Sequence, residues 1–362
     1  MIRNRRNPKR EHRRSLWLVA APMLLIILLC LSACSDMVLN PDGSISYPGQ
    51  TLQLNTIAGS PNESDPPSEG ATLILRPSET QAPSMTLRPS DPITDPNQSL
   101  TIEFLNTGKS DCILIRMDGK CILVDTADRN DSDLIRSTLD GYGITHIDCL
   151  ILTHYDNDHI GSAADVLEQY TVGEVYMPDY VRNSKLYRNT VAALTEAEGK
   201  GTTVHRLYAQ DVELTIGTGS LWINATAMEG YEPGQVLGAD EDNDQNEENN
   251  FSLITALRYG DITVLLCGDA EGERMAEYLP LAQARGITSC TLLKIPHHGG
   301  SADTGLLSAV RAWEPLACVV CTDAEQNVSA AIITNMTHVG AGQYFTYKGT
   351  VCFTADGTIS YK

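Results

Sequence analysis

Four side chains that can bind a metal ion lie within six residues of the sequence, directly after an apolar run. His154, Asp156, Asp158 and His159 follow the run 148–153. No packing role needs two imidazoles and two carboxylates at one strand end, and such groups are costly to bury without partners. Bound cations would remove that cost. The pattern therefore predicts a metal site at the end of a strand.

Two later motifs have the same form, an apolar run that ends in potential ligands. Asp269 follows the run 262–267, and His297 and His298 follow the run 290–295. Asp269 alone is equally well explained as the N-cap of the next helix. Adjacent histidines beside two glycines are harder to explain by packing, because neighbouring side chains diverge. Four of the eight histidines lie in the three motifs together, which indicates a site built from several strand ends.

The elements that must position these side chains begin near Leu100. Strands are expected at 101–106, 111–117, 120–125, 148–153, 251–259, 262–267, 290–295, 316–322 and 350–354, and helices near 131–140, 160–170, 185–198, 270–279, 302–312 and 325–337. Asp118-Gly119 is a two-residue hairpin turn signal. The alternation predicts one α/β domain over residues 100–362, with helices on the outer faces of mixed sheets.

The order of the motifs resembles the metallo-β-lactamase superfamily of binuclear metallohydrolases. More narrowly, it is similar to the extracellular hydrolase domain of DNA-internalisation competence proteins of the ComEC type. The likeness rests on His-x-Asp-x-Asp-His at 154–159, Gly-Asp at 268–269 and His-His-Gly at 297–299. The stretches 105–111, 122–126 and 143–148 are also in the style of that family. The resemblance implies a four-layer αβ/βα sandwich and a metal-dependent hydrolase.

The resemblance also implies a set of metal ligands. His154 and Asp156 would hold one metal ion, Asp158 and His159 would hold the other, and Asp269 would bridge the two. Two ions at such a site activate a shared water molecule and stabilise charge on the attacked phosphoryl or acyl centre.

The paired histidines have two roles to divide between them. Either His297 or His298 would complete the second metal position, and the other would donate a proton to the leaving group or hold the substrate oxygen. Catalysis is accordingly expected from these two residues and from Asp158. Asp111 and Asp125 are expected to support loops by accepting hydrogen bonds from backbone amides.

The chain departs from the superfamily pattern at the first metal position. Asp156 stands where the superfamily has a histidine, and Asn249-Asn250 stands near the place of a further histidine. The position is therefore rich in oxygen and short of a protein ligand, so it either binds weakly or fills only with substrate. Oxygen donors favour Mn²⁺ or Mg²⁺ over Zn²⁺. The acidic run 240–248 is expected to be a solvated loop beside the site.

The N-terminal segment has the features of an export signal. Residues 1–14 hold seven basic residues and one acidic residue, and the apolar run 16–31 leads to Leu31-Ser32-Ala33-Cys34. Small residues before this cysteine resemble the lipobox of bacterial lipoproteins. We therefore expect a signal peptide over 1–33, a lipidated Cys34 and a Pro/Ser/Asp-rich tether over 34–99. The alternative is an uncleaved membrane anchor. Both place the rest of the chain outside the cytoplasm, on the outer face of the cell membrane or in the periplasm.

The charge balance constrains the substrate. The chain has 26 Lys and Arg against 46 Asp and Glu, a net charge of −20. Removal of residues 1–33 would leave 19 basic against 45 acidic residues, a charge of −26. This excludes a globally basic surface that neutralises nucleic-acid phosphates. It does not exclude a small site charged by metal ions. The eight cysteines after residue 100 lie mostly in apolar runs and are expected to be reduced and buried.

Three functions are compatible with these features. The leading one is an exported, membrane-anchored hydrolase of nucleic-acid phosphodiesters. The second is a metallohydrolase of a small molecule, such as a lactone, thioester, lactam or phosphodiester metabolite, which the negative charge favours. The third is a lipoprotein that keeps the fold only for binding. No protein partner is inferred.

Overall fold

The computed structural model describes residues 38–39, 45–47, 50–52, 99–228, 232–237 and 248–362. The predicted signal peptide, Cys34 and most of the predicted tether lie outside these residues. Three short strands form an antiparallel sheet within the tether range: β1 (Val38–Leu39), β2 (Ile45–Tyr47) and β3 (Gln50–Leu52). These residues include types that favour strands, and the tether over 34–99 stays a prediction. Within the described part of the chain, no helix has the length and apolarity needed to cross a bilayer.

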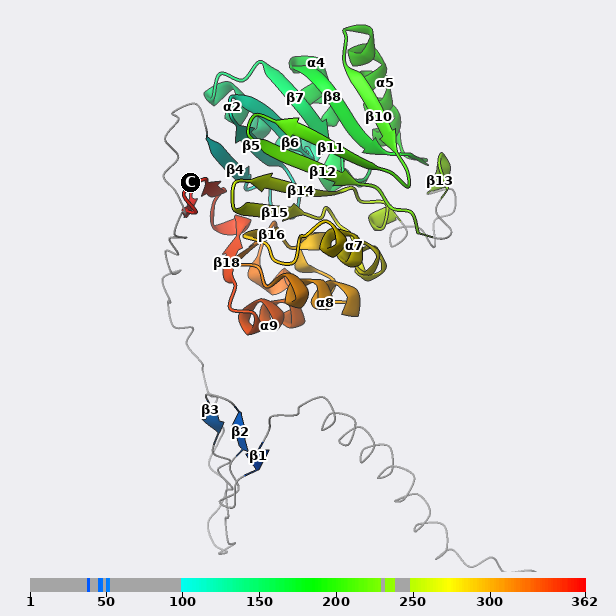
Figure 1. The fold of residues 1–362 in the computed structure, drawn as a ribbon. Helices are drawn as coiled ribbons and strands as arrows, with labels where there is room; N and C mark the ends of the chain where they lie inside the picture. Colours follow the sequence, from blue (N-terminus) through cyan, green and yellow to red (C-terminus); the bar gives the residue numbers. More distant parts are fainter. Residues whose placement is uncertain (1–37, 40–44, 48–49, 53–98, 229–231, 238–247) are drawn as a thin grey trace, which may run out of the picture. The chain divides into compact units, whose positions relative to one another are not determined.

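The folded domain contains two large mixed sheets (Figure 1). The first has the strand order β10-β8-β7-β6-β5-β4-β19-β20. Its strands are β4 (Leu100–Phe104), β5 (Ile113–Met117), β6 (Lys120–Val124), β7 (His146–Ile151), β8 (Thr171–Pro178), β10 (Thr203–Leu207), β19 (Val351–Thr354) and β20 (Ile359–Tyr361). Asp118 and Gly119 form the predicted turn between β5 and β6, and both have positive φ.

The second sheet has the order β11-β12-β14-β15-β16-β17-β18. Its strands are β11 (Asp211–Ile216), β12 (Gly219–Asn224), β14 (Ile254–Tyr259), β15 (Ile262–Leu266), β16 (Leu292–Lys294), β17 (Ala317–Val320) and β18 (Gly342–Phe345). β9 (Tyr180–Arg182) and β13 (Gln235–Leu237) form a parallel two-stranded sheet of their own.

Helices cover the outer face of each sheet, so the domain has the predicted four layers (Figure 1). One hydrophobic cluster is shared by the facing sides of the two sheets. A second cluster lies between the first sheet and its helices, and a third lies between the second sheet and its helices. The helices are α2 (Ser132–Gly141), α3 (Asn157–Ile160), α4 (Ala163–Gln169) and α5 (Lys185–Gly199) on the first sheet, with α7 (Gly272–Ala284), α8 (Thr304–Trp313) and α9 (Ala330–His338) on the second. Short 3₁₀ turns are η2 (Arg129–Asp131), η3 (Pro296–Gly299), η4 (Glu325–Asn327) and η5 (Thr346–Lys348).

The parallel strands determine where the site can form. β6 and β7 are parallel, as are β15 and β16, and the carboxyl ends of parallel strands lie at one edge of a sheet. All three sequence motifs follow such ends. The eight cysteines after residue 100 are buried and unpaired, as predicted. Cys318 and Cys321 face different hydrophobic clusters, as their spacing in a strand requires.

Candidate metal centre

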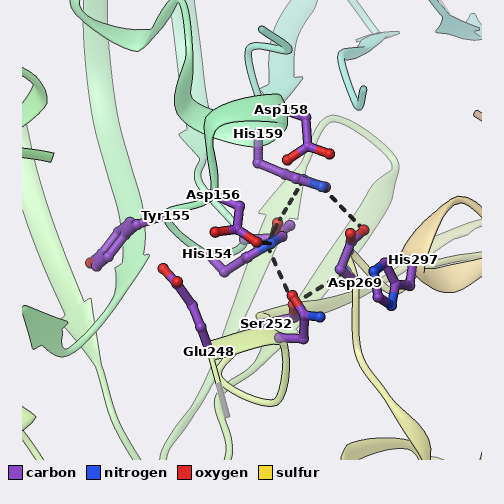
Figure 2. Close-up of polar contacts among 12 residues, drawn as sticks. His154, Tyr155, Asp156, Asp158, His159, Glu248, Ser252, Asp269 and His297 are labelled. Carbon is purple, nitrogen blue, oxygen red and sulfur yellow. Dashed lines mark hydrogen bonds and ion pairs between the residues drawn. The ribbon is translucent and has the colours of Figure 1, made fainter. Parts of the chain in front are cut away.

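Four potential ligands from three chain segments converge at the edge where the two sheets meet. Donor atoms of Asp158, His159, Asp269 and His298 all lie within 4.8 Å of one another. His159 Nε2 is 3.1 Å from Asp269 Oδ1, and His298 Nε2 is 3.2 Å from Asp158 Oδ2 and 3.3 Å from Asp269 Oδ2. Figure 2 shows Asp158, His159 and Asp269 turned toward a common point. The second predicted metal position is thus assembled with His298, and His297 is outside the group.

Hydrogen bonds on the outer side of each ring fix the orientation of the two imidazoles. His159 Nδ1 lies 2.7 Å from Asp125 Oδ2, and His298 Nδ1 donates to the Cys321 carbonyl oxygen at 3.0 Å. Within the described residues, neither Nε2 atom has a hydrogen-bond partner of good geometry. Both rings therefore direct their Nε2 atoms at the carboxylates, which is the arrangement of histidines that bind metal ions in proteins. The donor set fits a divalent ion.

Asp125 is held by the strand end that carries the first motif. Its two carboxylate oxygens accept hydrogen bonds from the Thr153 backbone N–H and hydroxyl, both at 2.7 Å. The predicted bond to a backbone amide is therefore present. The carboxylate also contacts His159, so its role extends to orienting a ligand.

Lys294 is a buried cation beside the four ligands. Its Nζ atom lies 2.5 Å from Asp111 Oδ2 and 3.4 Å from Asp269 Oδ1, and it donates to the Gly268 carbonyl at 2.7 Å. The sequence expectation for Asp111 was wrong, because its side chain pairs with this ammonium group and lies 3.6 Å from His298 Nδ1. A lysine within the apolar run 290–295 was the available signal, since a buried charge needs a partner.

The electrostatics of the group favour positive charge. Burial lowers the pKa of His298, but the carboxylates of Asp269, Asp158 and Asp111 outweigh burial and raise it to about 9. Burial likewise lowers the pKa of His159, while Asp269 and Asp125 raise it well above its ordinary value. The charges that hold protons on these imidazoles would hold a divalent cation in their place.

The carboxylates of the group are shifted in the opposite direction. Burial raises the pKa of Asp269, yet the charges of His159, His298 and Lys294 lower it well below its usual range. The pKa of Asp158 is also lowered, because its contacts with His298 and His159 outweigh burial. Both aspartates are therefore ionised and available as ligands. Asp269 is not an N-cap, because the N-cap of α7 is Glu271.

The residues of the first predicted position are arranged differently. His154 Nε2 is 3.7 Å from Asp156 Oδ2, but among the described residues no group of three or more potential ligands includes either side chain. Arg182 Nη1 lies 3.1 Å from Asp156 Oδ1 and forms an ion pair with Glu248. Burial raises the pKa of Asp156, while His154 and Arg182 lower it below its ordinary value. Glu248 is completely buried, so the solvated-loop expectation was wrong for this residue.

His297 lies at the rim of the group. It is 26% exposed, and its Nδ1 atom is 3.2 Å from Glu271 Oε1. His297 and His298 both have left-handed backbone angles, with φ of 50° and 53°. Such angles are uncommon for residues other than glycine and cost about 1 kcal/mol each. This backbone turns the two adjacent side chains in different directions, with one into the ligand group and one toward the opening.

The two sheets approach each other closely at Gly268. Its φ is +51°, and a Cβ atom at this position would lie 2.9 Å from the Thr153 side chain. Ser252, just before β14, has its Oγ atom 3.5 Å from His154 Nδ1, and the same Oγ accepts from the Asp269 backbone N–H at 3.2 Å. Glycine at this position lets the Asp269 loop reach the strand end that carries His154.

The side chains predicted from the sequence motifs lie close together, and the residues that support them came only from the structure. His154, Asp156, Asp158, His159, Asp269, His297 and His298 all lie at the same edge, as shown in part in Figure 2. Lys294, Arg182 and Glu248 were missed. Arg182 has no sequence signal, because its position beside Asp156 depends on where the β9–β13 pair folds. His338 is exposed at the end of α9.

Comparison with known proteins agrees with this fold and site. Residues 105–243 match the sequence model of the metallo-beta-lactamase superfamily. The four-layer architecture agrees with this match, so this part of the chain is similar to the metal-dependent hydrolases of that superfamily.

Two curated relatives are similar in sequence to this chain. ComE operon protein 3 of Bacillus subtilis (strain 168) is 27% identical over 164 residues, which are 45% of this chain and 18% of that protein. Recombination protein 2 of Haemophilus influenzae is 28% identical over 217 residues, 58% of this chain and 23% of that protein. The chain therefore spans less than a quarter of either relative. Among solved structures, the metallo-beta-lactamase fold protein YhfI of Bacillus subtilis is 12% identical with a TM-score of 0.44, covering 71% of this chain and 100% of that one.

Proposed function

We propose that the chain hydrolyses phosphodiester bonds of nucleic acid at the Asp158, His159, Asp269 and His298 centre. The observation that carries the proposal is the convergence of these four side chains, with both imidazole Nε2 atoms directed at the carboxylates. A divalent ion held there would supply Lewis acidity and would lower the pKa of a water molecule. The similarity to ComEC-like relatives, one of them named a recombination protein, supports nucleic acid as the substrate class.

The chain's own residues have separable tasks in this reaction. Asp269 contacts His159, His298 and Lys294, so it keeps the ligand group together. His297 is partly exposed beside the group, with Nδ1 near Glu271, and its Nε2 is the ring nitrogen left to face a substrate. His297 donates a proton to the leaving oxygen. Proton donation by a positioned side chain accelerates such steps by about 10²–10⁴-fold.

The cellular location is part of the same proposal. The basic leader, the apolar run and Cys34 favour an exported chain anchored to the outer face of the cell membrane by a lipid on this cysteine. Metabolic labelling with radioactive palmitate tests it: label in the wild-type chain and none in Cys34→Ala is the expected result. Equal labelling of both chains, or of neither, contradicts lipidation at Cys34.

Nuclease activity is tested directly on the purified chain. Single- and double-stranded DNA are incubated with Mn²⁺, Mg²⁺ or Zn²⁺, beside an Asp158→Ala variant. Cleavage by the wild type and its loss in the variant are expected. Equal cleavage by both, or none with any ion, contradicts the nuclease assignment.

A small-molecule substrate is the second candidate, and the net charge of −20 favours it because such a surface repels polyanions. The discriminating measurement is DNA affinity as a function of salt. Binding that weakens steeply with added salt indicates phosphate contacts and supports the nuclease. DNA binding that is undetectable, together with ion-dependent hydrolysis of a lactone, thioester or small phosphodiester, supports the alternative.

A further inference from the structure

The first metal position contains a guanidinium group. Arg182 Nη1 is 3.1 Å from Asp156 Oδ1, and the same nitrogen pairs with the Glu248 carboxylate. Figure 2 shows Glu248 extending toward Asp156 beside His154. The side chains of Arg182 and Asp156 are 20% and 24% exposed, so the arginine lies at the mouth of the site.

The surrounding structure holds both members of the ion pair in place. Arg182 is opposite Leu237 in the parallel β9–β13 ladder, and the next residue, Asn183, donates its backbone N–H to the Leu237 carbonyl at 3.0 Å. Glu248 accepts a hydrogen bond from the Tyr180 hydroxyl at 2.7 Å. Arg182 is therefore a fixed part of the site, supported from two sides.

The first metal position has fewer potential metal ligands than the second position has. Besides the bridging Asp269, only His154 and Asp156 are assigned to it from the sequence, and among the described residues neither of these two belongs to a group of three potential ligands. Asn249, near the place of the missing histidine, donates its side-chain amide to Glu271 Oε1 at 3.2 Å. A divalent ion beside Asp156 would also meet the positive charge of Arg182, which already pairs with both carboxylates there.

We propose that Arg182 takes the place of the first metal ion, so that the centre binds one divalent ion, at the Asp158, His159, Asp269 and His298 position. Its guanidinium supplies the second positive charge, with planar donors suited to a phosphate or carboxylate oxygen. This inference rests on the proposed hydrolase function. It departs from the binuclear arrangement that the sequence resemblance implied.

The test is metal stoichiometry in the purified chain. The chain is saturated with Mn²⁺ and freed of excess, and bound metal is measured by mass spectrometry. Electron paramagnetic resonance then distinguishes isolated Mn²⁺ from coupled pairs. One isolated ion per chain is expected for the wild type. Two coupled ions per chain would overturn the inference and leave the hydrolase function standing, whereas no bound ion would contradict both.

Variants at position 182 test the role of the arginine itself. Arg182→Gln removes the charge, which frees His154, Asp156 and Glu248 for a second ion, so two ions are expected. Arg182→Lys retains the charge and should keep one. Arg188→Gln is the matched control, because it removes an exposed arginine of α5, and it should also keep one. If the Arg182→Gln chain folds and still binds only one ion, Arg182 does not take the place of the first metal ion. If that variant does not fold, the wild-type stoichiometry still decides the inference.

Discussion

At the scale of single residues, the site is a set of ligands oriented by their neighbours. Asp125 shows this most clearly, because one carboxylate binds the Thr153 N–H and hydroxyl and also contacts His159 Nδ1. Its backbone has φ of 58°, an angle that asparagine also tolerates. The side chain can therefore be changed there with little effect on the backbone.

Asp125→Asn should weaken binding of Mn²⁺ without unfolding the chain. A carboxylate accepts hydrogen bonds on two oxygens, whereas the asparagine amide has only one acceptor oxygen. The asparagine therefore cannot accept from both Thr153 and His159 as Asp125 does, and His159 loses its fixed orientation. Loss of such an outer partner lowers metal affinity by roughly 10- to 100-fold. Isothermal titration calorimetry measures the change. Asp148→Asn is the control, because Asp148 binds Lys120 and the Cys121 N–H at the other end of β7. Equal affinities in wild type and Asp125→Asn would contradict the role.

The paired histidines should separate in their effects on metal and on rate. His298→Ala removes a ligand, so bound Mn²⁺ should fall below one ion per chain. His297→Ala should keep the ion while kcat falls by about 10²–10⁴-fold, the range for a lost proton donor. Metal analysis and steady-state kinetics on the same preparations give both quantities. Loss of the ion in His297→Ala with retention in His298→Ala would reverse the assignment.

At this scale, a site residue could be predicted from the sequence only where the signal lies in neighbouring residues of the chain. The three motifs were readable because each concentrates unusual residue types at one strand end. Lys294 was detectable in principle as a charge inside an apolar run. Arg182 and Glu248 were not, because their relation to Asp156 arises from the packing of segments separated by 26 and 92 positions in the chain.

At the scale of elements, the predicted strands and helices correspond closely to those observed. The strongest periodic runs, such as the predicted helix 185–198 and the observed α5 (Lys185–Gly199), agree within one residue. The strands that were missed include β8, β10, β11, β12 and β18. Several carry charged or polar residues on an exposed face, as in β11, so they lack a continuous apolar run.

Gly268→Ala should be more damaging than an alanine at another left-handed glycine. Gly268 and Gly260 have φ of +51° and +56°, but only at Gly268 would a Cβ meet a neighbour, the Thr153 side chain at 2.9 Å. Backbone strain alone costs about 1 kcal/mol, which is the expectation for Gly260→Ala. Overpacking adds about 1–3 kcal/mol at Gly268. Urea denaturation measures both, and equal losses would show that the close approach has no energetic consequence.

At the scale of the whole molecule, the site exists because two sheets end at the same edge. The His154 to His159 motif belongs to the first sheet, and Asp269 and His298 belong to the second. The domain architecture was predictable from the resemblance, because the motif order reflects the strand order of the superfamily. The pairing of the sheets across their shared core could not be read from periodicity, since both faces of the central strands are buried.

The carboxylate of Asp118 joins a turn of the first sheet to the second sheet by hydrogen bonds. This predicts that Asp118 contributes to stability in a pH-dependent way. From the β5–β6 turn, it accepts hydrogen bonds from the Ser99 N–H at 2.9 Å, the Tyr259 hydroxyl at 3.0 Å, and the Thr218 N–H and hydroxyl at 2.7 and 2.8 Å. Burial raises its pKa, but these donors outweigh burial and lower it below its ordinary value. Asp118→Asn keeps the left-handed turn but places the amide NH₂ group, itself a donor, against some of these hydrogen-bond donors. The free energy of unfolding should therefore fall by about 1–2 kcal/mol at neutral pH.

The sign of the pH effect follows from the lowered pKa of Asp118. A carboxylate with a lower pKa in the folded state stabilises the fold above its unfolded pKa of about 3.9, and this stabilisation is lost as pH falls through the folded pKa. The difference in unfolding free energy between wild type and Asp118→Asn should therefore be largest at neutral pH and should shrink below about pH 3.9. Urea denaturation across this range measures it. Asp133→Asn, on the exposed side of α2, should show little difference at any pH, since surface ion pairs contribute little. If the difference in unfolding free energy between wild type and Asp118→Asn stays constant down to acid pH, the charge of the carboxylate has no part in joining the sheets.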